Sequence, residues 1–202
     1  MKALFTDIAA TSLIFILVGC ASHRNGVEQG NYQTVGKDPH RDTELARKLN
    51  DQAVDDLNKE NYDGAEKELK QALDADITFG PAHNNLGTVY FQHHRLYLAA
   101  WEYQYAIKLM PGQAEPRNNL GLVLEQVGKL DDAVENYAKA KELAPEEPQF
   151  IGNLARARIR RGDKGNDIKE LLTQVVLHDS RPEWSEWAKE QSARLGSTEK
   201  GP

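Results

Sequence analysis

The 202-residue sequence has little cysteine, few aromatic residues and no excess of positive charge. Cys20 is its one cysteine, and Phe, Trp and Tyr make up 7% of the chain. One cysteine excludes an internal disulfide framework and a cysteine-rich zinc module. Lys and Arg number 25 against 31 Asp and Glu, for a net charge of −6. Because nucleic-acid binding needs a basic surface that displaces counterions, no nucleic-acid partner is expected.

An apolar run near the N-terminus, residues 8–18, is interrupted only by Thr11 and Ser12. It is shorter than the roughly 20 residues of a transmembrane helix, but it fits the apolar part of a secretory signal. The run ends in Leu17-Val18-Gly19-Cys20, which resembles the bacterial lipobox. That resemblance implies a signal peptide over 1–19 and an acylated Cys20 that binds the lipid bilayer. The alternative is an ordinary signal or N-terminal anchor in which the cysteine is incidental.

The residue after the cysteine is Ala21. In lipoproteins of enteric-type bacteria, Asp at this place retains the protein in the inner membrane. The resemblance therefore implies a lipid-anchored protein of the bacterial cell envelope, on the outer membrane and facing the periplasm. Glycine, proline and polar residues dominate the next segment, so residues 20–41 are predicted to be the lipidated cysteine and a flexible tether.

Internal repeats follow at a period of 34 residues. Asn84-Asn85-Leu86-Gly87 recurs as Asn118-Asn119-Leu120-Gly121, and Ala99, Tyr103, Ala106 and Pro111 recur at the same offset. A fixed period of this length indicates a solenoid of stacked units. The pattern resembles the tetratricopeptide repeat (TPR), a helix-turn-helix unit, in a bacterial TPR lipoprotein.

The resemblance implies an all-α fold, a right-handed α-solenoid of about four repeats with a C-terminal capping helix. The TPR domain is placed at 42–196, with repeats at about 46–79, 80–113 and 114–147 and a degenerate repeat at 148–181. Helices are expected at about 43–60, 62–76, 80–93, 96–109, 114–127, 130–143, 148–161 and 166–178. The capping helix follows at 182–195, and a disordered tail at 197–202.

Position 6 of each repeat lies on the concave surface of a TPR solenoid. Here it holds Asp51, Asn85, Asn119 and Asn153, and position 5 adds Asn84 and Asn118. Because an amide both donates and accepts hydrogen bonds, such a ladder can grip the main chain of an extended peptide. The alternative is that these asparagines are consensus residues that pack beside core leucines.

Arg156 and Arg160 fall on the concave side of the basic fourth repeat, where they could clamp a carboxylate or another anion. The other interpretation is a solvated basic end that neutralises acidic neighbours.

Tyr97, Trp101 and Tyr105 share one face of a predicted helix, at positions that are polar in the adjacent repeats. They are predicted to form a second interface on the convex side, for a partner or for self-association. The alternative is that the tether or the capping helix covers them.

No catalytic constellation is recognisable, and His83, His93 and His94 lack the spacing of two metal ligands on one helical face. We therefore expect no enzyme, metal or cofactor. The sequence favours a membrane-anchored adaptor that binds an extended peptide of an envelope protein and supports assembly of an envelope complex. The alternative is a self-associating structural lipoprotein, a homo-oligomer that uses its convex aromatic surface.

Overall fold

The computed structural model of the protein describes residues 41–198. The predicted signal peptide 1–19, Cys20 and residues 21–40 of the predicted tether lie outside this part. Residues 41–198 form nine α-helices and no β-strand. The helices are α1 Thr43–Asn58, α2 Tyr62–Ala75, α3 Gly80–Gln92, α4 Leu96–Leu109, α5 Glu115–Gln126, α6 Leu130–Leu143, α7 Pro148–Arg161, α8 Asn166–His178 and α9 Pro182–Thr198. The first eight begin and end within two residues of the predicted ranges, and α9 runs three residues further than expected.

Local sequence signals set these boundaries. The Asp42 side chain caps α1 by accepting a hydrogen bond from the Leu45 N–H at 3.0 Å. Proline in the first turn begins α3, α5 and α7 (Pro81, Pro116 and Pro148). The turns inside the four helix pairs contain residues of positive φ that recur at the repeat period, Glu60, His94, Gly128 and Gly162, and the last of these turns adds Gly165. The repeat is therefore a repeat of backbone conformation as well as of side chains.

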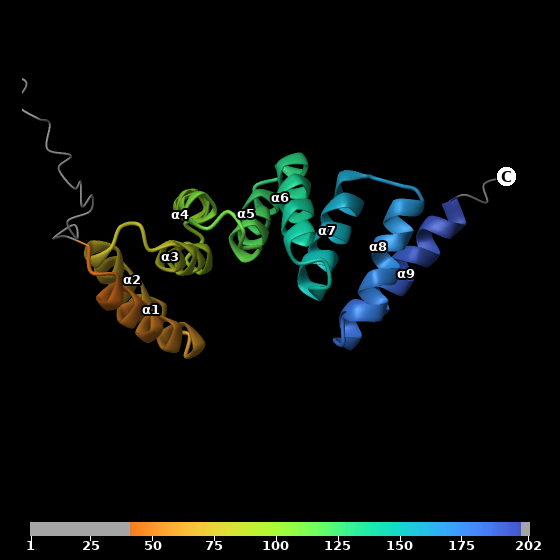
Figure 1. Cartoon of the computed structure of the whole chain (residues 1–202). Coiled ribbons are helices and arrows are strands. Elements are labelled where there is room, and N and C mark those ends of the chain that lie inside the picture. Colours follow the sequence, from red (N-terminus) through yellow and green to blue (C-terminus); the bar gives the residue numbers. More distant parts are fainter. Residues whose placement is uncertain (1–40, 199–202) are drawn as a thin grey trace, which may run out of the picture. The chain divides into compact units, whose positions relative to one another are not determined.

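Consecutive helices form helical hairpins: α1 with α2, α3 with α4, α5 with α6 and α7 with α8. Each hairpin contacts the next one along the chain (Figure 1). The predicted all-α fold of stacked helix pairs is confirmed. Small residues lie fully buried where the helices approach: Ala53, Ala65, Ala72, Ala99, Ala106, Ala133, Ala140 and Ala155. A Cβ on Gly87 would come within 2.7 Å of the Tyr103 ring, and one on Gly121 within 2.6 Å of the Tyr137 ring. Only glycine fits these two contacts without a shift of the tyrosine.

The last helix, α9, packs against α8 and covers the end of the fourth pair. Ala188 on α9 is fully buried in the C-terminal core cluster, with Trp184, Trp187 and Leu195 packed around it. The Trp184 ring lies on Gly152 of α7, where a Cβ would stand 2.7 Å from Trp184 Cζ3. The three preceding repeats carry asparagine at this position, whereas the fourth carries Gly152, which leaves space for the Trp184 indole.

Candidate functional site

Six asparagines on α1, α3, α5 and α7 form one continuous line of hydrogen bonds, which we call the asparagine network. Each Nδ2 donates to the next Oδ1 along the line from Asn153 to Asn118 (2.8 Å), Asn119 (3.4 Å), Asn84 (3.2 Å), Asn85 (3.4 Å) and Asn50 (2.9 Å). All five bonds run in the same direction, toward the first repeat. The network therefore ties four successive repeats together along one face.

The structure adds a member to the line of asparagines in the first repeat. Asn50, 7% exposed, receives the hydrogen bond from Asn85, whereas Asp51 is exposed and lies outside the network. The 34-residue spacing of Asn50, Asn84 and Asn118 was the signal that could have found the missing member.

The network is partly a packing device and partly an accessible surface. Asn118 and Asn153 are 1% and 3% exposed, so both are enclosed by protein, whereas Asn84, Asn85 and Asn119 are half-buried. Each of these three uses one of its two N–H groups within the network, which leaves donor and acceptor capacity at the surface. A pocket beside them is lined by Pro81, Asn84, Asn85, Met110, Gln113, Glu115 and Pro116.

The two predicted anion-binding arginines are paired within the protein. The carboxylate of Glu125, 4% exposed, accepts hydrogen bonds from Arg156 Nε (3.1 Å) and Nη2 (2.8 Å) and from Arg160 Nη1 (2.7 Å). The Tyr137 hydroxyl donates a fourth at 2.8 Å. We call Glu125, Tyr137, Arg156 and Arg160 the Glu125 cluster. Two cations face one carboxylate, so the cluster keeps one net positive charge.

Burial alone would raise the pKa of Glu125, but the hydrogen bonds from Arg156 and Arg160 outweigh it and hold that pKa at about 2. Burial and the adjacent Glu125 carboxylate both raise the pKa of the Tyr137 hydroxyl. Glu125 is thus ionised and Tyr137 protonated at neutral pH. The 34-residue spacing was the signal that could have found Glu125, because Leu57, Phe91 and Ile159 hold the equivalent places in the other repeats and a carboxylate there needs partners.

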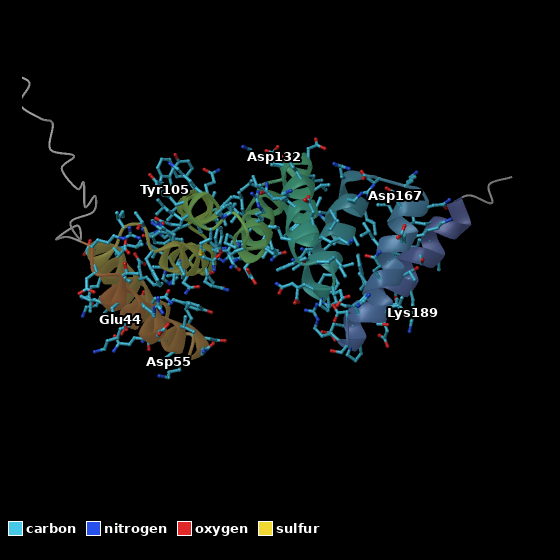
Figure 2. The ribbon with its side chains drawn as sticks, in the orientation of Figure 1. Glu44, Asp55, Tyr105, Asp132, Asp167 and Lys189 are labelled. Carbon is cyan, nitrogen blue, oxygen red and sulfur yellow. The ribbon has the colours of Figure 1, made fainter. Side chains whose placement is uncertain are left out.

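On the opposite side of the second repeat, Tyr97, Trp101 and Tyr105 of α4 are 77%, 51% and 40% exposed. These three residues are the aromatic stripe, of which Tyr105 is labelled in Figure 2. Their predicted exposure is thus observed, and α9 packs against α8 rather than over them. The capping-helix alternative is therefore wrong, while the tether alternative concerns residues outside the described part. Trp101, Gln104, Tyr105 and Lys108 line a pocket on this surface.

His83 of α3 packs against the aromatic stripe through Tyr105. Its ring stacks on Tyr105, with centroids 5.2 Å apart and planes 17° apart. Nδ1 lies 2.6 Å from Glu102 Oε2 and Nε2 lies 2.9 Å from the Ile77 carbonyl oxygen. Burial lowers the pKa of His83, but these two contacts raise it to a net value above its ordinary one. Both partners accept hydrogen bonds, so both ring nitrogens of His83 donate when the imidazole is protonated. Within residues 41–198, no group of three or more His, Cys, Asp or Glu side chains is placed to hold a metal ion.

Two tetratricopeptide repeat family models match the chain, over residues 50–116 and 114–147. Residues 50–147 of the chain are therefore tetratricopeptide repeats. A comparison with curated proteins gave no significant match. In the part of this TPR protein that the structure describes, no helix is both long enough and apolar enough to cross a membrane.

Solved TPR structures share the fold. Pseudomonas aeruginosa PilF matches with a TM-score of 0.65 at 20% identity, over 79% of this chain and 78% of PilF. YrrB, described as a TPR protein with an unusual peptide-binding site, matches with a TM-score of 0.61 at 23% identity, over 74% of this chain and 76% of YrrB. The first TPR of Spaghetti (RPAP3), solved with the HSP90 peptide SRMEEVD, matches with a TM-score of 0.59 at 20% identity, over 62% of this chain and 99% of that one.

Proposed function

We propose that the protein is a membrane-anchored adaptor that holds an extended peptide segment of an envelope protein against its asparagine network. The observation that carries this proposal is the half-buried, solvent-accessible edge of the network at Asn84, Asn85 and Asn119, with a pocket beside Asn84 and Asn85. Amides that alternate donors and acceptors match the alternating N–H and C=O groups of an extended main chain. Peptide binding by YrrB and by the first TPR of RPAP3 supports the same use of the fold here.

The test compares asparagines of the network that solvent can reach with one that is enclosed by protein. A random peptide library is selected on the purified chain, and the affinity of a selected peptide is measured by calorimetry. Asn85→Ala with Asn119→Ala removes two accessible amides, and the peptide should bind about 10- to 100-fold more weakly. Asn118→Ala is the matched control because Asn118 belongs to the network but is 1% exposed. It should lower stability and leave the affinity of the folded protein unchanged.

The geometry adds one requirement to this experiment. Asn85 donates to the buried Asn50 oxygen, so its loss leaves a buried acceptor unsatisfied, at a cost of roughly 1–3 kcal/mol. Affinities must therefore be compared at a temperature where every variant is folded. Unchanged affinity in the folded double variant would show that the network is only a packing device.

The membrane anchor of this proposal rests on Leu17-Val18-Gly19-Cys20. Addition of diacylglycerol to the Cys20 thiol and acylation of the new N-terminal amine would give stable membrane binding, since each buried CH₂ contributes about 0.8 kcal/mol. Ala21 supports the outer membrane as the destination. Cys20→Ala should abolish incorporation of labelled fatty acid and leave the signal uncleaved. Normal labelling of that variant would overturn the lipoprotein assignment.

A second candidate function is self-association through the aromatic stripe. The exposure of Tyr97 and Trp101, at 77% and 51%, is the observation that favours it, because Trp and Tyr are enriched at interface hot spots. Trp101→Glu should leave the melting temperature nearly unchanged and dissociate the oligomer in sedimentation velocity. A wild-type chain that sediments as a monomer at all concentrations contradicts this candidate.

A further inference from the structure

The concave line of position-6 residues does not end with the asparagines. Trp187 stands 34 residues after Asn153, at the same place in the repeat period, and Pro182 stands 34 residues after Pro148. Helix α9 is therefore built as the first helix of a further repeat, and it sets an indole where the other repeats set a polar side chain. Arg156 lies three residues after Asn153 on α7, on the same face of the helix.

At this end of the groove, Arg156, Glu183, Trp184 and Trp187 line a pocket of about 230 Å³, which we call the indole pocket. An engineered apolar cavity of roughly 150 Å³ is known to hold a benzene molecule. The indole pocket therefore has room for an aromatic ring or a leucine side chain. Its two larger walls are the indoles, with centroids 5.4 Å apart and planes 73° apart.

The walls of the pocket are fixed before any ligand arrives. Trp184 rests on the bare backbone of Gly152 and is flanked by the guanidinium groups of Arg156, at 5.5 Å from the ring centroid, and Arg181, at 5.1 Å. Arg181 is held by the buried carboxylate of Asp179 through Nε (2.8 Å). Arg156 is held by Glu125. A preorganised apolar corner binds a side chain without the entropic cost of ordering its own walls.

The charges that line the pocket favour neither sign of ionic ligand. Arg156 and Glu183 contribute one charge of each sign to its lining, so neither a cation nor an anion gains from both. The indoles offer apolar surface, and an aromatic guest can pair with them edge to face. The favoured guest is a large uncharged apolar side chain.

We propose that the indole pocket binds one large apolar side chain, aromatic or leucine-sized, of the peptide whose main chain lies on the asparagine network. This inference rests on the proposed peptide-binding function and adds the sequence preference that a main-chain grip lacks. The network holds any extended peptide, and the pocket chooses those with an apolar residue at the end that lies on α7 and α9.

The experiment is the peptide library selection on the full chain, repeated with Trp187→Ala. The wild-type chain should enrich peptides that carry Phe, Tyr, Trp or Leu at one fixed position. Substituting Ala at that position should weaken binding by about 10- to 100-fold, the range expected when an apolar side chain of this size loses its burial. Trp187→Ala should weaken the parent peptide to the same extent and leave the Ala-substituted peptide unaffected. Leu177→Ala, which shortens an apolar side chain 74% exposed on α8, is the control and should bind normally.

A direct measurement covers the case in which Trp187→Ala does not fold. The chain has three tryptophans, so its indole N–H signals in a proton–nitrogen NMR spectrum are assigned by single Trp→Phe variants. The selected peptide should shift the Trp184 and Trp187 signals and leave the Trp101 signal in place. Peptides without an apolar preference, or unmoved Trp187 signals, overturn the inference alone. A wild-type chain that selects no peptide overturns the proposed function together with it.

Discussion

The asparagine network and the Glu125 cluster share helices α5 and α7, but they join the repeats by different chemistry. The network links α1, α3, α5 and α7 through neutral amides at 2.8–3.4 Å. The cluster links α5, α6 and α7 through one buried carboxylate and its three donors. Neutral amides are cheap to desolvate and each contributes modestly, whereas a buried charge costs much energy when it loses its partners.

The difference shows where the stability of this solenoid is most sensitive to the loss of a side chain. Loss of one asparagine removes at most two neutral hydrogen bonds of the network. Loss of Glu125 removes the acceptor of three side chains at once. The largest effects are therefore expected at the charged end of the groove.

Glu125→Ala should lower the free energy of unfolding by about 3 kcal/mol, the low end of the range for one partner of a buried ion pair, because Arg160 is half exposed. Glu142→Ala is the matched control. Glu142 pairs with Lys139 at 2.7 Å in an exposed i,i+3 pair, and its removal should cost roughly 0.5 kcal/mol or less. Urea unfolding of the two variants measures both. Equal losses would mean that the cluster stabilises the fold no more than a surface pair does.

Acid should weaken the Glu125 cluster, whereas the amides of the network do not titrate. The pKa of Glu125 is about 2 in the folded protein, against an ordinary value of 4.5. Since folding lowers this pKa, the contribution is complete above pH 4.5 and is lost as the pH falls toward 2, in total about 3 kcal/mol. The pKa values of Asp76 and Asp163 are also about 2, so their contributions fade in the same range.

Glu125→Gln separates these contributions, because glutamine keeps the shape and does not titrate. The stability difference between wild type and Glu125→Gln should narrow steadily as the pH falls from 4.5 to 2. A difference that stays constant over this range would assign the acid sensitivity to other carboxylates.

Gly152→Asn tests the boundary between the network and the indole pocket. It restores the asparagine that the first three repeats carry at this position. The new Cβ would lie 2.7 Å from Trp184 Cζ3, so the indole must move, and overpacking of this kind costs roughly 1–3 kcal/mol. A change toward the repeat consensus should thus lower the melting temperature. In contrast, Gly112→Ala meets no atom within 4 Å and should be nearly neutral.

Much of this architecture could be predicted from the sequence, because each helix–helix contact of a solenoid recurs in several repeats. The 34-residue period located the helix pairs and the buried small residues such as Ala99 and Ala133. The same regularity indicated the asparagines, although it did not show that Asn118 and Asn153 bond to each other rather than face solvent. Two adjacent asparagines look equivalent in a sequence, and only the helix geometry decides which one is enclosed.

Features that occur once were harder to predict. Glu125 has no counterpart in the other repeats, and its role depends on three donors brought from α6 and α7. Repeat 1 has Ile77 where a proline follows α4 and α6, and the side chain of Asp76 holds the chain after α2 instead. The Asp76 carboxylate accepts hydrogen bonds from Thr43 at 2.6 Å and from the Thr78 N–H at 2.9 Å. The spacing marks Glu125 only as a carboxylate at a place that is apolar in the other repeats, and it does not identify the donors that satisfy it.

The smallest expected effect is also the cleanest comparison of the two regions, because the fold supplies a matched pair of tyrosines. Tyr103 and Tyr137 occupy the same place in successive repeats, and each ring packs on a glycine, Gly87 or Gly121. Their hydroxyls differ: Tyr103 donates to the Thr88 hydroxyl at 3.3 Å, and Tyr137 donates to the Glu125 carboxylate at 2.8 Å.

A hydrogen bond to a charged group contributes roughly 1.5–3 kcal/mol, against roughly 0.5–1.5 for a neutral one. Tyr137→Phe should therefore lower the unfolding free energy about 1 kcal/mol more than Tyr103→Phe, although both keep the ring contacts. If urea unfolding gives the same loss for both variants, the arginines alone satisfy Glu125, and the charged end of the groove is no more tightly coupled than the amide region.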